Sequence, residues 1–83
     1  MDTRQLAALV AVIERSSFSH AATELGVTQP AVSLAIRSLE RRLGVTLIDR
    51  TGRQIAPTEA GRVVYRHAQR MLAAEHVSAE AAI

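Results

Sequence analysis

A segment in the middle of the 83-residue chain carries side-chain types that recognise nucleic acid. Residues 29–43 divide on a helical wheel, at about 100° per residue, into an apolar side and an outward side. The outward side holds Pro30, Ser33, Leu34, Arg37 and Arg41, and Gln29 lies at its first turn. An amide can pair with an adenine edge, a hydroxyl with a base or a phosphate, and a guanidinium with a phosphate or a guanine. The apolar side chains can meet thymine methyl groups, so the set indicates contacts to a duplex groove.

Two predicted helices position this face. Residues 29–43 form the second one, because Thr28 suits an N-cap and Gly44 suits a left-handed C-cap. The first one spans residues 18–25 and follows Ser17, another N-cap residue. Two helices joined by a tight, glycine-containing turn fit a helix-turn-helix, here at about residues 18–37, whose second helix enters a major groove.

The remaining predicted elements frame this pair of helices. Apolar residues at i, i+3, i+4 and i+7 predict an earlier helix over about residues 3–15. Short β-branched runs at 45–48 and 54–56 predict a small hairpin, which Pro57 ends. A final helix follows this proline and is too long for one small domain to bury its whole apolar face. Its far end therefore needs a partner.

Further candidate contacts surround the groove face. The free N–H groups at two helix starts, near Ser17 and Thr28, are natural phosphate sites. His20 is expected to be exposed on the first of the two helices, within reach of a phosphate. The hairpin arginines, Arg50 and Arg53, are expected beside the groove, where they contact the backbone or the minor groove.

Several candidates also have a simpler structural explanation. Gln29 and Pro30 are common at a helix start, and Arg37 could be a solvated charge. Glu40 and Arg50 are expected to form an ion pair that ties the second helix to the hairpin. In that case Arg50 positions the hairpin and does not touch nucleic acid.

Composition narrows the function classes. All ten basic residues are arginine and the net charge is +2, but residues 37–70 hold eight arginines against three acidic residues, a local charge of +5. A basic stretch of this kind favours a polyanionic partner. Cysteine is absent, and neither paired histidines nor a glycine-rich phosphate loop occurs. We therefore expect no catalytic residue, no metal and no cofactor. The lack of cysteine and of a long apolar run predicts a cytoplasmic protein that has no membrane partner.

Five motifs resemble the LysR-type transcriptional regulator family, in order and at the family's spacing. They are SFSHAA at 17–22, VTQPAVS at 27–33, IRSLE at 36–40, LGVTLIDR at 43–50 and PTEAG at 57–61. The resemblance extends over roughly residues 1–72. It implies a mainly α, winged helix-turn-helix domain, with a three-helix core and a small β-hairpin wing, at residues 1–58. A linker and dimerisation helix then occupies residues 59–83, and an effector-sensing domain would lie outside this excised or naturally short chain.

The resemblance also assigns roles by position. It places four residues in the groove segment: Thr28, Gln29, Pro30 and Ser33. Arg53 matches the family's wing arginine. The linker helix would join two copies as a homodimer on dyad-symmetric double-stranded DNA, with a tetramer in a full-length form. From the apolar face of that helix we expect four dimerisation residues: Val64, Ala68, Met71 and Leu72.

Three positions depart from the family's pattern. Leu34 stands where arginine is usual, so an apolar contact replaces a polar or phosphate contact. Ile48 replaces a phenylalanine under the wing, and Pro57 replaces a leucine, which stiffens the entry to the linker helix. The first departure bears on sequence preference.

Two function hypotheses follow. The first is sequence-specific DNA binding by a dimer for transcription regulation, at the bacterial nucleoid in the cytoplasm. The second is a winged-helix assembly module that joins a partner through its long helix and does not recognise a DNA sequence. The salt dependence of duplex binding separates them, because phosphate-dominated binding weakens steeply with salt. An enzyme is a third class, but Asp49 and Glu59 lie on different predicted elements without an evident pocket.

Overall fold

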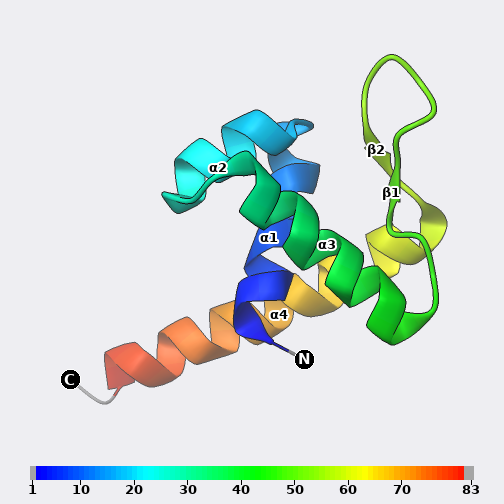
Figure 1. Ribbon diagram of the computed structural model, residues 1–83. Coiled ribbons are helices and arrows are strands. Elements are labelled where there is room, and N and C mark those ends of the chain that lie inside the picture. Colours follow the sequence, from blue (N-terminus) through cyan, green and yellow to red (C-terminus); the bar gives the residue numbers. More distant parts are fainter. Residues whose placement is uncertain (1, 82–83) are drawn as a thin grey trace.

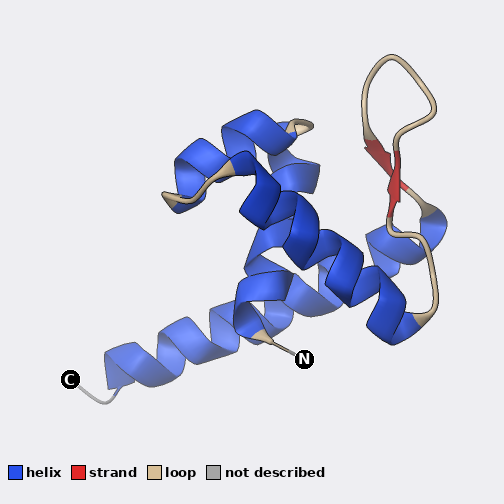
Figure 2. Cartoon of the chain, viewed as in Figure 1, coloured by secondary structure: helices blue, strands red, loops and turns tan. Residues whose placement is uncertain are grey.

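The computed structural model describes residues 2–81, with side chains described through residue 74. The elements are three helices, a two-stranded antiparallel sheet and a long final helix: α1 (Thr3–Arg15), α2 (Phe18–Leu25), α3 (Gln29–Leu43), β1 (Ile48–Asp49), β2 (Ala56–Pro57) and α4 (Glu59–Ala81). Figure 1 shows α1 among the other three helices, the hairpin standing at one end, and the C-terminal part of α4 projecting from the other. The chain is mainly helical, as predicted (Figure 2). Within residues 2–81, none of the helices has the length and apolar content of a membrane span.

Polar caps and a left-handed glycine set helix ends where the sequence predicts them. The Ser17 hydroxyl accepts a hydrogen bond from the His20 N–H at 3.1 Å, and the Thr28 hydroxyl accepts one from the Ala31 N–H at 3.2 Å. Gly26 ends α2 with φ of +69°, a conformation that costs glycine little. The predicted bounds of α1, α2 and α3 are confirmed.

The core lies between α1 and its neighbours and is aliphatic. Its largest fully buried side chains come from α1, α3 and the segment before β1: Leu6, Leu9, Val12, Val32, Ile36, Leu39 and Leu47. Small buried side chains lie in α1 and α2 and let these helices approach closely: Ala8, Ala11, Ala21 and Ala22. Burying one such leucine or isoleucine contributes about 1.5–3 kcal/mol relative to its exposed state. Because α2, α3 and α4 all contact α1, this helix is their common support.

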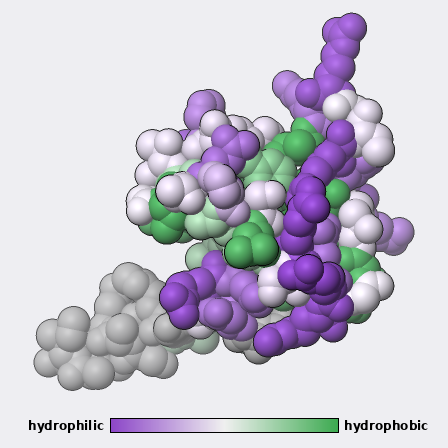
Figure 3. Space-filling model, in the orientation of Figure 1, coloured by the Kyte–Doolittle hydropathy of each residue, from purple (hydrophilic) through white to green (hydrophobic). Residues whose placement is uncertain are grey.

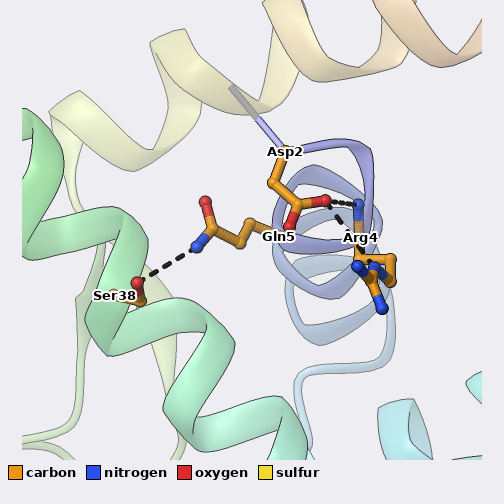
Figure 4. A network of polar contacts seen from close by, with 4 residues as sticks. All are labelled: Asp2, Arg4, Gln5 and Ser38. Carbon is orange, nitrogen blue, oxygen red and sulfur yellow. Dashed lines mark hydrogen bonds and ion pairs between the residues drawn. The ribbon is translucent and has the colours of Figure 1, made fainter.

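Polar contacts also hold α1 against its neighbours. The amide nitrogen of Gln5 donates to Ser38 Oγ on α3 at 3.1 Å, and Figure 4 shows the two side chains meeting between the helices. On the other side, the Tyr65 hydroxyl of α4 donates to Glu14 of α1 and accepts from Gln69, both at 2.9 Å. The Glu14 carboxylate raises the pKa of Tyr65, because its hydrogen bond stabilises the protonated phenol. These bonds help to fix how α3 and α4 are turned about α1.

The hairpin is shorter than predicted and begins later. Its two strands pair through Ile48 opposite Pro57 and Asp49 opposite Ala56. The sequence predicts strands at 45–48 and 54–56 and ends the hairpin at Pro57, but β1 starts only at Ile48 and the proline is part of β2. Proline is tolerated there because a two-stranded sheet consists of edge strands, in which one N–H can be spared.

Glu40 of α3 binds the backbone at the start of β1. Its Oε2 accepts hydrogen bonds from the N–H groups of Leu47 at 2.8 Å and Ile48 at 3.3 Å. The N–H groups of Leu47 and Ile48 therefore attach the start of β1 to α3. The ion pair expected between Glu40 and Arg50 does not form among the described residues, so that prediction is wrong. Glu40 ties the hairpin to α3 through the backbone instead.

The start of α4 lies directly against the chain before β1. The Thr58 N–H donates to the Leu47 carbonyl at 3.0 Å. The Thr58 hydroxyl donates to the Thr46 carbonyl at 2.6 Å and accepts the Gly61 N–H at 2.9 Å. A Cβ at Gly61 would overlap the Leu47 carbonyl oxygen. The approach of α4 to this segment therefore requires glycine.

Gly61→Ala is expected to destabilise the fold by about 2 kcal/mol or more, because the added methyl group must displace the backbone of Leu47. Equilibrium unfolding in urea measures the change in the free energy of unfolding. Gly52→Ala is the matched control, since a Cβ there meets only the Gln54 carbonyl oxygen at 3.6 Å. The control should change stability by less than about 0.5 kcal/mol. Equal stability of the two variants would contradict the close approach at Gly61.

Candidate nucleic-acid interface

The first turns of α3 form an exposed surface on the side away from α1. Gln29, Pro30 and Arg37 are exposed and Ser33 is half-buried. Leu34 is 63% exposed, an unusual degree for a large apolar side chain. Figure 3 shows hydrophilic residues gathered along one side of this view, up to the hairpin. The sequence-predicted groove residues therefore share one accessible face.

The polar side chains of this face have no partners in the part of the chain that the structure describes. Within the described part of the chain, the side chains of Gln29, Ser33 and Arg37 form neither hydrogen bonds nor ion pairs. An amide offers two donors and an acceptor, a hydroxyl one donor, and a guanidinium five donors. The full hydrogen-bonding capacity of the face is thus available to an external ligand.

Two candidate phosphate contacts, Ser17 and Thr28, are also the N-caps of α2 and α3. Each hydroxyl accepts a backbone N–H of its own helix, and its proton has no acceptor among residues 2–81. His20 is exposed one turn after Ser17, beside Glu24 and its ion-pair partner Arg15. The described residues contain no cluster of three or more His, Asp or Glu side chains placed to hold a metal ion.

The hairpin and its loop, here called the wing (residues 48–57), present two arginines. Arg53 is exposed in the loop between the strands. Asp49 accepts hydrogen bonds from the Thr51 N–H at 2.9 Å and from its hydroxyl at 2.6 Å. These bonds hold the pKa of Asp49 below its usual value and order the exit from β1. Arg50 lies between Asp49 and Thr51 in the sequence. Its guanidinium carbon is 4.7 Å from the centroid of the Phe18 ring.

A shallow hollow lies between α3 and the wing. Arg37 lines it from α3 and Arg50 lines it from the wing. Three threonines share the lining: Thr46, Thr51 and Thr58. The carboxylates of Glu40 and Asp49 are also there, but both already accept hydrogen bonds. Two guanidinium groups beside hydroxyls suit a phosphate.

The four residues expected at a dimer interface do not share one accessible face of α4. Ala68 has no exposed surface, so it cannot contact a partner, and Val64 packs against the core of its own copy. Leu72 is half-buried, whereas Met71 is 46% exposed. The periodicity correctly identified an apolar face, but α1 covers part of it. Val63, which is 41% exposed, was not among the predicted residues.

Phe18 is the candidate that the sequence did not reveal. Its ring is half-buried and packs against the core. The ring also carries Arg50, which lies 32 positions later in the sequence. Composition alone could have pointed to Phe18, because an aromatic ring in an arginine-rich chain is a potential partner for a guanidinium group.

The chain is similar to known proteins over most of its length. Residues 3–62 match the pattern of the family described as "Bacterial regulatory helix-turn-helix protein, lysR family". A relative in Azotobacter vinelandii, an uncharacterized HTH-type transcriptional regulator in the ibpB-leuC intergenic region, is 50% identical over 72 residues, which cover 87% of this chain and 50% of that protein. The RuBisCO operon transcriptional regulator of Allochromatium vinosum is 44% identical over 66 residues, covering 80% of this chain and 22% of that protein. The chain thus spans half of the first relative and a smaller share of the second.

Solved structures have the same fold. The BenM DNA-binding domain in complex with catB site 1 DNA superposes with a TM-score of 0.94 at 34% identity, covering 99% of this chain and 91% of that chain. The CbnR DNA-binding domain in a DNA complex gives a TM-score of 0.90 at 35% identity, covering 99% and 94%. The predicted winged helix-turn-helix is therefore confirmed. Because the family pattern covers more than half of the sequence and the fold agrees, the chain belongs to the LysR family of bacterial regulatory helix-turn-helix proteins.

Proposed function

We propose that this chain binds double-stranded DNA sequence-specifically, as the DNA-recognition part of a transcription regulator. The observation that carries the proposal is the exposed face of α3, whose polar side chains have no partner among the described residues. A helix of this kind fits a major groove, where each base pair presents a distinct set of donors and acceptors. The BenM and CbnR domains were crystallised as DNA complexes, which supports DNA binding by this chain.

The chemistry of each side chain indicates its role. Gln29 at the start of α3 pairs with an adenine edge, and Ser33 contacts a base or a phosphate. Leu34 covers its exposed apolar surface against a thymine methyl group, which favours A·T pairs at that position. Arg53 neutralises backbone phosphate from the wing.

Assembly through α4 accompanies this function rather than replacing it. A module that joins a partner only through α4 would leave the α3 face unused, but that face exposes the hydrogen-bonding groups of Gln29, Ser33 and Arg37, which have no partner among the described residues. The exposed apolar side chains of Val63 and Met71 support a homodimer through α4, which would place two copies of α3 on a dyad-symmetric site. Effector sensing would belong to a longer regulator.

Arg53→Ala is expected to weaken duplex binding on every sequence, because the lost contact is to phosphate. Fluorescence anisotropy at several salt concentrations should show a slope of log affinity against log salt reduced by about one unit. An unchanged slope would place Arg53 away from the phosphates. A wild-type chain that shows no duplex binding at low salt would reject the DNA function itself.

Gln29→Ala is expected to cost about 1–3 kcal/mol on the preferred duplex and to relax the choice of one base pair. Selection from a randomised duplex pool, run with both proteins, measures the change in preference. Binding to unrelated duplex should barely change and serves as the internal control. Equal losses on all sequences would show that Gln29 does not recognise a base.

Met71→Asp is expected to shift the monomer–dimer equilibrium toward monomer, because a charge would replace an exposed apolar contact on α4. Sedimentation equilibrium over a range of concentrations measures the dissociation constant. Ala73→Asp introduces the same charge at another exposed position of α4 and should have the smaller effect. A dimer equally strong in both variants would place the interface elsewhere.

A further inference from the structure

We propose that Phe18 is a positioning residue for DNA binding. Its ring holds the guanidinium of Arg50 beside the hollow between α3 and the wing, where Arg50 and Arg37 together bind one phosphate of the DNA backbone. The inference rests on the proposed DNA-binding function. It adds the contact that fixes a basic group of the wing before DNA arrives.

Arg50 is held by an aromatic face and not by an acid. The 4.7 Å from its guanidinium carbon to the Phe18 ring centroid lies within the range of cation–π contacts, about 6 Å. Glu40 accepts backbone N–H groups before and within β1, and Asp49 accepts from the turn that follows it. Within residues 2–81, Arg50 has neither a hydrogen bond nor an ion pair. Its five N–H donors therefore remain available to a ligand.

The ring is a fixed anchor for this contact. Phe18 is the first residue of α2, directly after the N-cap Ser17, and its side chain packs against the hydrophobic core. Figure 1 shows that this end of α2 is the one nearer the wing. Because the Phe18 ring is fixed by the core, the Arg50 side chain that stacks on it loses conformational freedom when the chain folds and not when it binds DNA. Preorganisation of this kind raises affinity.

The surroundings of Arg50 identify the ligand as a phosphate. Arg37 lines the same hollow from α3, so two guanidinium groups flank it. The carboxylates of Glu40 and Asp49 also line the hollow, but each already accepts two hydrogen bonds from neighbouring groups of the chain. The Ser17 hydroxyl and the N-terminus of α2 lie next to the anchoring ring, and both favour an anion. A phosphodiester oxygen between α3 and the wing would contact both guanidinium groups. The duplex backbone supplies such a group wherever α3 lies in a groove.

A double-mutant cycle on duplex affinity tests the proposal, using the full chain and a duplex that it selects from a random pool. Phe18→Leu should weaken binding about 3- to 10-fold when Arg50 is present, and less than about 2-fold in an Arg50→Ala background. Arg50→Ala should weaken binding on all sequences and lower the salt slope by about 0.9. Phe18→Tyr keeps an aromatic face and should restore most of the affinity.

Arg53 supplies the matched control, because it is also a wing arginine but does not stack on the ring. Phe18→Leu and Arg53→Ala should therefore act additively. Equal effects of Phe18→Leu with and without Arg50 would overturn the proposal, since they would indicate a general loss of structure. If wild-type protein binds duplex DNA but Arg50→Ala does not weaken it, the proposal fails while the DNA function stands.

The contact can also be observed without any substitution. Protons over an aromatic ring resonate upfield, so the δ protons of Arg50 should be shifted upfield in the NMR spectrum of the free wild-type chain. This measurement keeps the test decisive if Phe18→Leu does not fold. Random-coil shifts for these protons would overturn the proposal. A wild-type chain that fails to bind any duplex at low salt would instead remove the underlying DNA function.

Discussion

The burial of α1 is the constraint on which the rest of the fold depends. All three other helices contact it, and the side chains of Leu9 and Val12 have no exposed surface. Gln5 and Glu14 add polar contacts to α3 and α4. Because α1 takes up the apolar side of α3, the opposite side of α3 must face outward. The accessible recognition face thus follows from how the core is filled.

The first and the later turns of α3 have different roles. Its first turns carry side chains that have no partner among the described residues, including Gln29 and Ser33. Its later turns support the wing, because Glu40 holds the backbone before β1. A carboxylate that binds two N–H groups fixes the wing more directly than an exposed ion pair would, since exposed pairs contribute little. This use of Glu40 also leaves Arg50 available to stack on Phe18.

Features set by neighbouring residues were predictable from the sequence, and features set by distant residues were not. Thr28 and Gly44 mark the ends of α3 through bonds within one or two turns, so the predicted bounds are correct. The backbone at the start of β1 is held by the side chain of Glu40, and Arg50 stacks on a ring 32 residues earlier. Ala68 illustrates a further limit. Periodicity identifies the apolar face of a helix, but it does not tell which neighbour covers that face.

The contact between the start of α4 and Leu47 bears on how two copies joined through α4 would lie on a DNA duplex. Thr58 and Gly61 hold α4 against Leu47, so the helix leaves the core in one direction. Its 23 residues extend for about 35 Å, which makes it a lever arm. A tilt of about 5° at Gly61 would move the far end by about 3 Å, close to the rise of one base pair. In the proposed dimer, the fit of Gly61 against the Leu47 carbonyl would therefore affect the spacing of the two half-sites.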